Sequence, residues 1–143
     1  MDCPETSMVQ RWARKAPQQR YYSYRLMQRP SFHVMGACTK NWMGVCHADE
    51  LFYLFTIPDQ KYETDKKLSW SMIRAWTSFA TNSDPGWVTT VQWEEAFTRD
   101  FSNNDIIDFD IRYMHLEHKN YKMISGFYKQ ICEAFWNDKL KML

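Results

Sequence analysis

Apolar side chains that recur at steps of three and four residues predict helices in three parts of the chain. The first covers residues 5–16, where such side chains lie among basic and polar ones and Pro17 ends the helix. The second begins near Thr64 or Asp65, either of which could cap it, and ends at the turn 82–86. Its apolar face consists of Leu68, Met72, Ala75, Trp76, Phe79 and Ala80.

The third predicted helix lies at the carboxyl end. Its apolar face consists of Tyr121, Ile124, Tyr128, Ile131, Cys132 and Phe135. Elsewhere, alternation and aromatic side chains favour strands over residues 20–26 and 106–111. Residues 27–43 show no period, which predicts a long surface connection of the kind that often carries function. Asp49 and Glu50 are typical of the first turn of a short helix, because the helix dipole favours negative charge there.

Charge and length narrow the classes of protein. Lysine and arginine total 18 against 17 acidic residues in a chain of 143, so there is no basic excess for nucleic acid or an anionic membrane surface. The longest apolar run, 51–57, is too short to span a bilayer, and the first five residues lack the order of a signal peptide. The charged run 65–67 is interpreted as a solvated helix start. We therefore expect about one globular domain that contains no membrane span and does not bind nucleic acid.

One histidine is a candidate for catalysis. His47 lies between a turn led by Gly44 and the acidic pair that follows it, and an imidazole can act as a general base because it titrates near neutrality. Taken alone, a loop histidine is more often structural. Cys46 is adjacent, but neighbouring side chains in an extended loop point apart, which favours a buried or disulfide-bonded cysteine over a nucleophile.

The sequence favours no metal site. Cys38, Cys46 and His47 could be combined with His115 and His118, but the spacing is not that of zinc or haem motifs. We interpret His115 and His118 as solvated residues ahead of the terminal helix.

Four stretches together resemble the type-B carboxylesterase and cholinesterase family, a branch of the α/β-hydrolases. That family's histidine loop presents a catalytic histidine in an H-[AG]-x-E pattern, and it is similar to GVCHADELFYLF at 44–55. Its helix ending in W-x-x-F-A and a turn is similar to LSWSMIRAWTSFATNSDPG at 68–86. Its terminal helix is similar to CEAFWN at 132–137, and its tyrosine-rich strand to 20–26. The resemblance covers nearly the whole chain in order.

The resemblance implies a fold class and a role for His47. Residues 1–143 would be the carboxyl-terminal portion of an α/β-hydrolase domain, mostly helical, with one or two sheet strands and the catalytic histidine loop. His47 would take the proton of a serine hydroxyl that attacks a carboxylic ester, and pass it to the leaving alcohol. Serine and acid precede histidine in this fold, and the chain holds no Gly-x-Ser-x-Gly elbow. Asp49 and Glu50 are too close on the chain to serve as the acid, so the chain alone is expected to be inactive.

The resemblance leaves a second class of function open, because non-catalytic adhesion proteins of the neuroligin type keep this histidine region without the serine. The residues Ala48 and Asp49 after His47 are closer to general carboxylesterases than to cholinesterases. The family further implies a small ester substrate, no cofactor, a secreted or extracellular complete protein, and association of two copies through the terminal helix.

Four cysteines are compatible with two disulfides or with four buried thiols. The resemblance implies a bond between Cys3 and Cys132, which would contribute about 4 kcal/mol by the chain-entropy argument in an oxidising compartment. Cys38 and Cys46 have no counterpart in the resemblance, and a bridge between them stays an open alternative.

Overall fold

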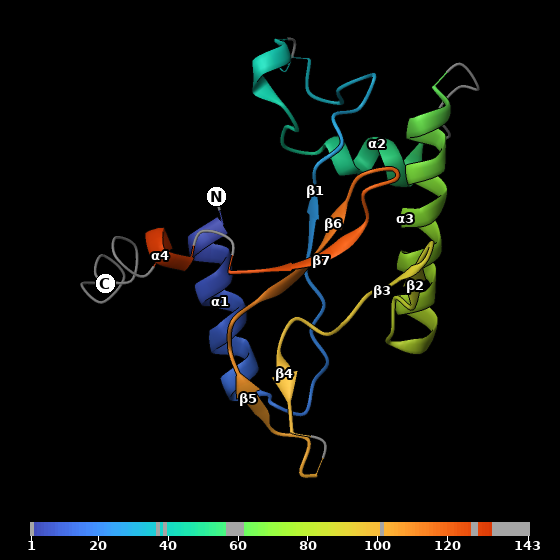
Figure 1. The fold of residues 1–143 in the computed structure, drawn as a ribbon. Coiled ribbons are helices and arrows are strands. Elements are labelled where there is room, and N and C mark those ends of the chain that lie inside the picture. Colours follow the sequence, from blue (N-terminus) through green and yellow to red (C-terminus); the bar gives the residue numbers. More distant parts are fainter. Residues whose placement is uncertain are drawn as a thin grey trace. The chain divides into compact units, whose positions relative to one another are not determined.

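A computed structural model describes residues 2–36, 38, 40–56, 62–100, 102–126 and 129–132. Within these ranges the chain forms two compact units, whose elements are labelled in Figure 1. The first unit comprises Met1–Ser23, Glu95–Tyr113 and Ile124–Leu143, and the second comprises Tyr24–Glu94 and Met114–Met123.

The first unit is built on helix α1 (Asp2–Lys15) and a two-stranded antiparallel ladder. Strand β4 (Thr98–Arg99) pairs there with β5 (Ile106–Asp108), and the short helix α4 spans Lys129–Ile131. A disulfide joins Cys3 to Cys132, with Cα atoms 5.1 Å apart. The apolar core of this unit consists of Ala13, Ala96, Phe97 and Ile111. The bond between the two ends of the chain therefore matches the pairing that the resemblance implied.

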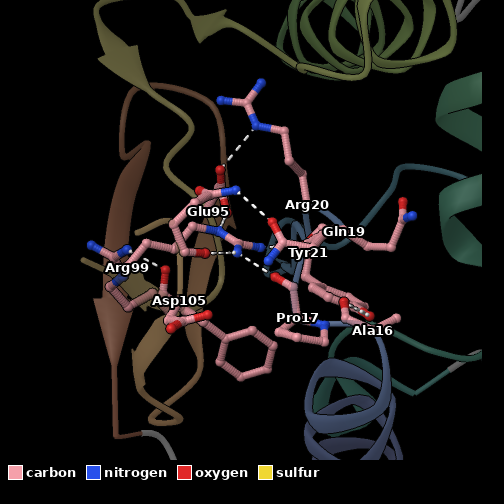
Figure 2. A network of polar contacts seen from close by, with 12 residues as sticks. Ala16, Pro17, Gln19, Arg20, Tyr21, Glu95, Arg99 and Asp105 are labelled. Atoms are coloured by element: carbon pink, nitrogen blue, oxygen red, sulfur yellow. Dashed lines mark hydrogen bonds and ion pairs between the residues drawn. The ribbon is translucent and has the colours of Figure 1, made fainter. Parts of the chain in front are cut away.

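Polar contacts around Arg99 fix the segment that follows α1 (Figure 2). The Arg99 guanidinium donates to the backbone carbonyls of Pro17, Gln19 and Asn104 and to the Glu95 carboxylate, which is 2.6 Å from its Nε. Arg20 donates to the other oxygen of Glu95 at 2.9 Å. The segment after α1 is neither helix nor strand, so its carbonyls need donors from elsewhere. The planar Arg99 guanidinium supplies donors to several of them at once.

The second unit packs helix α2 (Asp49–Phe55) against the long helix α3 (Glu63–Asn82). Strands β2 (Trp87–Val88) and β3 (Val91–Gln92) form a small antiparallel hairpin. Strand β1 (Tyr24–Leu26) lies parallel to the part of β6 (Arg112–Leu116) that belongs to this unit, with Tyr24 opposite Met114 and Leu26 opposite Leu116. The sheet order is β1-β6-β7, where β7 is Lys122–Ser125. The largest fully buried apolar side chains of this unit are Tyr53, Leu68, Met72, Met114, Leu116 and Val88.

The three-to-four-residue spacing predicted the helices well, whereas alternation predicted the strands less well. The helix expected over 5–16 and the helix expected from about Thr64 to the turn 82–86 are confirmed as α1 and α3, and the acidic pair does open α2. The strand expected over 20–26 is confirmed only at its last three residues, and that over 106–111 only at its first three. Strand limits depend on partners far along the chain, which a local pattern does not contain.

Asp65 is neither a helix cap nor part of a solvated helix start, so both interpretations are wrong. Helix α3 begins at Glu63 after Tyr62, which makes no side-chain cap hydrogen bond. Asp65 lies inside the first turn and is 2 % exposed. Its carboxylate serves residues outside the helix instead, as described below.

The terminal helix does not begin where its pattern suggested. Tyr121 and Ile124 belong to a segment whose strand β7 is hydrogen-bonded to β6, because the sheet offers it a partner. His115 lies on β6 and is partly buried, with its Nε2 3.0 Å from Glu117, so a solvated position ahead of a helix is wrong for it. Tyr128 and Phe135 lie outside the described residues, and so does most of the helix through which two copies were expected to associate.

Candidate functional site: the histidine loop

His47 is exposed on the connection between β1 and α2, residues 27–48. The one-turn 3-10 helix η1 (Asn41–Met43) precedes it, and Gly44 follows with a φ of 64°. Ala48, directly after the histidine, has a φ of 67°. Among the residues that the structure describes, none forms a hydrogen bond or an ion pair with the His47 imidazole. Both imidazole nitrogens of His47 are therefore open to a partner that the described part of the chain does not supply.

The adjacent carboxylate is directed to another histidine. Asp49 is fully buried, and its oxygens lie 2.9 and 3.0 Å from Nδ1 of His33. The Nε2 atom of His33 accepts a hydrogen bond from Nε of Arg29 at 3.0 Å. Arg29 also donates to Oδ1 of Asn41 at 2.6 Å. An acceptor at Nε2 requires the proton on Nδ1, so His33 is neutral in this arrangement and donates to Asp49.

Asp49 also closes the turn that contains His47. Its carboxylate accepts the backbone N–H of Cys46 at 2.7 Å, and its own backbone N–H donates to the Cys46 carbonyl at 3.2 Å. Helix α2 has no side-chain cap hydrogen bond at its start. The carboxylate therefore serves the turn before the helix.

A second disulfide joins Cys38 to Cys46, whose Cα atoms are 6.4 Å apart. This settles the alternative that the sequence left open. Together with His33 and Asp49, the two sulfurs form a group of ligand types whose donor atoms lie within 4.8 Å of one another. A disulfide sulfur is not the thiolate that a zinc ion requires, so this arrangement does not form a zinc site. His47, His115 and His118 are not members of the group.

The start of the connection is held by Asp65. One carboxylate oxygen accepts a hydrogen bond from Nε2 of Gln28 at 2.7 Å, and the other accepts one from the backbone N–H of Ser31 at 2.8 Å. The Tyr53 hydroxyl donates to the same group at 3.3 Å. Burial, followed by the charge of Asp65, raises the pKa of Tyr53. Each end of the connection is thus bound by a buried aspartate, Asp65 of α3 at its start and Asp49 of α2 at its close.

The roles of His33 and Asp65 were missed by sequence reasoning. His33 lies in a stretch without a period, and it is sixteen residues from its partner. Asp65 has the sequence position of an ordinary helix-start acid. No local signal distinguished either residue from a solvated polar group.

Comparison with known proteins defines the family. The sequence pattern of the carboxylesterase family matches residues 1–132. The chain belongs to the carboxylesterase family. Chicken (Gallus gallus) acetylcholinesterase is 30% identical over 146 residues, covering 99% of this chain and 17% of that protein. Acetylcholinesterase-1 of Trittame loki is 30% identical over 95 residues, covering 64% of this chain and 16% of that protein.

The chain spans about a sixth of the length of these relatives. The family implies an α/β-hydrolase fold, with which the helices and small sheets described above are compatible. The two disulfides are of the kind found in secreted and extracellular proteins. No helix within the described ranges has the length and apolar character needed to cross a bilayer.

Proposed function

We propose that this chain is the carboxyl-terminal part of a serine carboxylesterase in which His47 is the general base. The imidazole takes the proton of a serine hydroxyl as the serine oxygen bonds to the ester carbonyl carbon. It then gives that proton to the alcohol oxygen as the bond between this oxygen and the carbonyl carbon breaks. Water, activated by the same imidazole, releases the carboxylic acid from the serine.

The observation that carries the proposal is the position of His47 within the family match. It is an exposed histidine, without a partner among the described residues, on a turn fixed by a buried carboxylate and a disulfide. A general base must reach its nucleophile with one nitrogen and an orienting acid with the other. A histidine already engaged on both sides, as His33 is, does not meet that requirement.

The nucleophile and the acid are assigned to a part of the protein outside these residues. The sequence has four glycines and no Gly-x-Ser-x-Gly elbow. The Asp49 carboxylate is occupied by His33 and Cys46, which supports an acid from elsewhere. The proposed substrates are small carboxylic esters, and the proposed location of the complete protein is extracellular.

The test begins with the intact mass of the native protein, captured from its source with an antibody against the terminal segment. We expect a species several times heavier than 17.3 kDa that yields a Gly-x-Ser-x-Gly peptide. In that species His47→Ala should abolish hydrolysis of an aryl ester, whereas His118→Ala, a matched histidine of the same unit, should retain it. Hydrolysis by the 143-residue chain alone, lost on His47→Ala, would contradict the proposal.

A further inference from the structure

We propose that Asp49 and His33 are positioning residues for His47. They fix the backbone turn that presents its imidazole, while touching neither substrate nor nucleophile. This inference rests on the proposed function, since it assigns the pair a role in the same reaction. It makes His33, a residue outside the histidine-loop motif, part of what the reaction requires.

The first support is the closure of the turn on both sides of His47. The Cys46 N–H donates to the Asp49 side chain at 2.7 Å, and the Cys46 carbonyl accepts the Asp49 N–H at 3.2 Å. The N–H and the carbonyl of Cys46, the residue before His47, are thus both bound to Asp49, which lies two positions after His47. Loss of the side-chain contact would leave the N–H of Cys46 unpaired at a partly buried site.

The second support is that the Asp49 carboxylate cannot turn freely. It is 0% exposed, and His33, with an 11% exposed side chain, holds it through Nδ1. Arg29 fixes the His33 ring from the other side through Nε2, and Asn41 holds Arg29. Since a buried carboxylate without a donor is costly, this polar chain sets which way Asp49 faces.

The third support is covalent. The disulfide from Cys38 ends on Cys46, so the residue before His47 is held by a side-chain sulfur as well as by Asp49. Positioning matters because a displacement of about 1 Å in a catalytic group can cost about 100-fold in rate. Several constraints meeting on Cys46 are therefore what an exposed general base needs from its loop.

The first test uses the 143-residue chain and amide hydrogen exchange. In Asp49→Ala, which removes the acceptor of the Cys46 N–H, we expect the Cys46 amide to lose at least a factor of ten in its protection against exchange. The Trp93 amide, bonded to Gly86 in the same unit, should change less than threefold. Asp65→Ala is the matched control: it removes another buried aspartate that binds this connection, and protection at Cys46 should be retained relative to Trp93. Equal losses at Cys46 and Trp93 in Asp49→Ala would show a general effect on folding and overturn the proposal.

A pair of substitutions at His33 separates a specific contact from bulk. The amide nitrogen of Asn can occupy the place of Nδ1, so His33→Asn should keep the Cys46 amide protected, whereas His33→Ala should not. Nitrogen NMR of the unaltered chain should show the His33 proton on Nδ1. If His33→Ala leaves Cys46 as protected as His33→Asn does, His33 has no positioning role.

The second test uses the complete esterase and separates this inference from the proposed function. We expect Asp49→Ala to lower kcat about 10- to 100-fold with KM within threefold, and His33→Asn to stay close to the unaltered enzyme. If His47→Ala retains activity, the proposed function fails. If His47→Ala is inactive and Asp49→Ala keeps its kcat within twofold, the proposed function stands and the positioning role is refuted.

Discussion

Replacement of Arg99 by alanine should destabilise the first unit far more than replacement of Arg20. Both arginines bind Glu95, but the Arg99 side chain is 9% exposed and that of Arg20 is 49% exposed. Arg99 also donates to the carbonyls of Pro17 and Gln19, as Figure 2 shows. The two substitutions therefore compare a buried and an exposed partner of one carboxylate.

The magnitude follows from what Arg99 leaves behind. Breaking a buried ion pair costs about 3–5 kcal/mol, and a hydrogen bond to a charged group contributes about 1.5–3 kcal/mol without being additive. Glu95 keeps Arg20, and the carbonyls at the chain surface can regain water, so we expect about 3 kcal/mol. An exposed pair contributes at most about 1 kcal/mol, which is the expectation for Arg20→Ala. Arg99→Lys should retain little, because an ammonium cannot reproduce the planar fork.

Native-state hydrogen exchange measures this locally. The Ala96 amide donates to the Tyr21 carbonyl at 2.7 Å and the Arg112 amide to the Ala96 carbonyl at 2.9 Å, all within the first unit. A loss of about 3 kcal/mol corresponds to about 100-fold faster exchange of both amides, against at most about fivefold for Arg20→Ala. Equal effects of Arg20→Ala and Arg99→Ala, or less than fivefold for the latter, would refute the reasoning.

Three further predictions concern covalent and titratable groups. Replacing Cys3 and Cys132 together by serine should lower the free energy of unfolding by about 4–5 kcal/mol, measured against urea, since the bond closes a long loop; an unchanged midpoint would contradict this. Burial raises the pKa of Tyr53, so the folded chain keeps a proton that the unfolded chain loses, and stability should fall as pH rises above about 10; Tyr53→Phe should make that slope shallower, and the pKa of the partly buried Tyr121, which burial also raises, accounts for the remainder. Hydrogen bonds from His115 and then Asn120 lower the pKa of Glu117, so its contribution is present above about pH 4.3 and lost as pH falls through the folded value; Glu117→Gln should flatten that part of an acid titration.

The helices could be predicted because their signal is local. An amphipathic helix shows its buried face every three to four residues, and that period located α1 and α3 without knowledge of any partner. The strands depend on distant residues: β1 exists where Tyr24–Leu26 meets Met114–Leu116. β7 shows the same effect in reverse, because pairing with β6 overrode a helical spacing at Tyr121 and Ile124.

The candidate site, like the fold, could be predicted only where the sequence carried a local signal. His47 was proposed from a motif, and the resemblance that contains this motif also implied the Cys3–Cys132 bond, which the structure contains. The pair His33 and Asp49 was not found, because side chains sixteen residues apart in an irregular connection leave no period in the sequence. Such contacts arise from the folded path of the connection itself.

The two buried aspartates show what a pattern leaves undecided at a helix start. Asp49 and Asp65 both stand in a first turn, where the helix dipole favours a negative charge whether or not water reaches it. An exposed carboxylate there needs no partner, but a buried one must find donors for its oxygens. The connection supplies them, through Cys46 and His33 at one end and Ser31 and Gln28 at the other. Burial thus turns two ordinary helix-start acids into the anchors of the loop that carries His47.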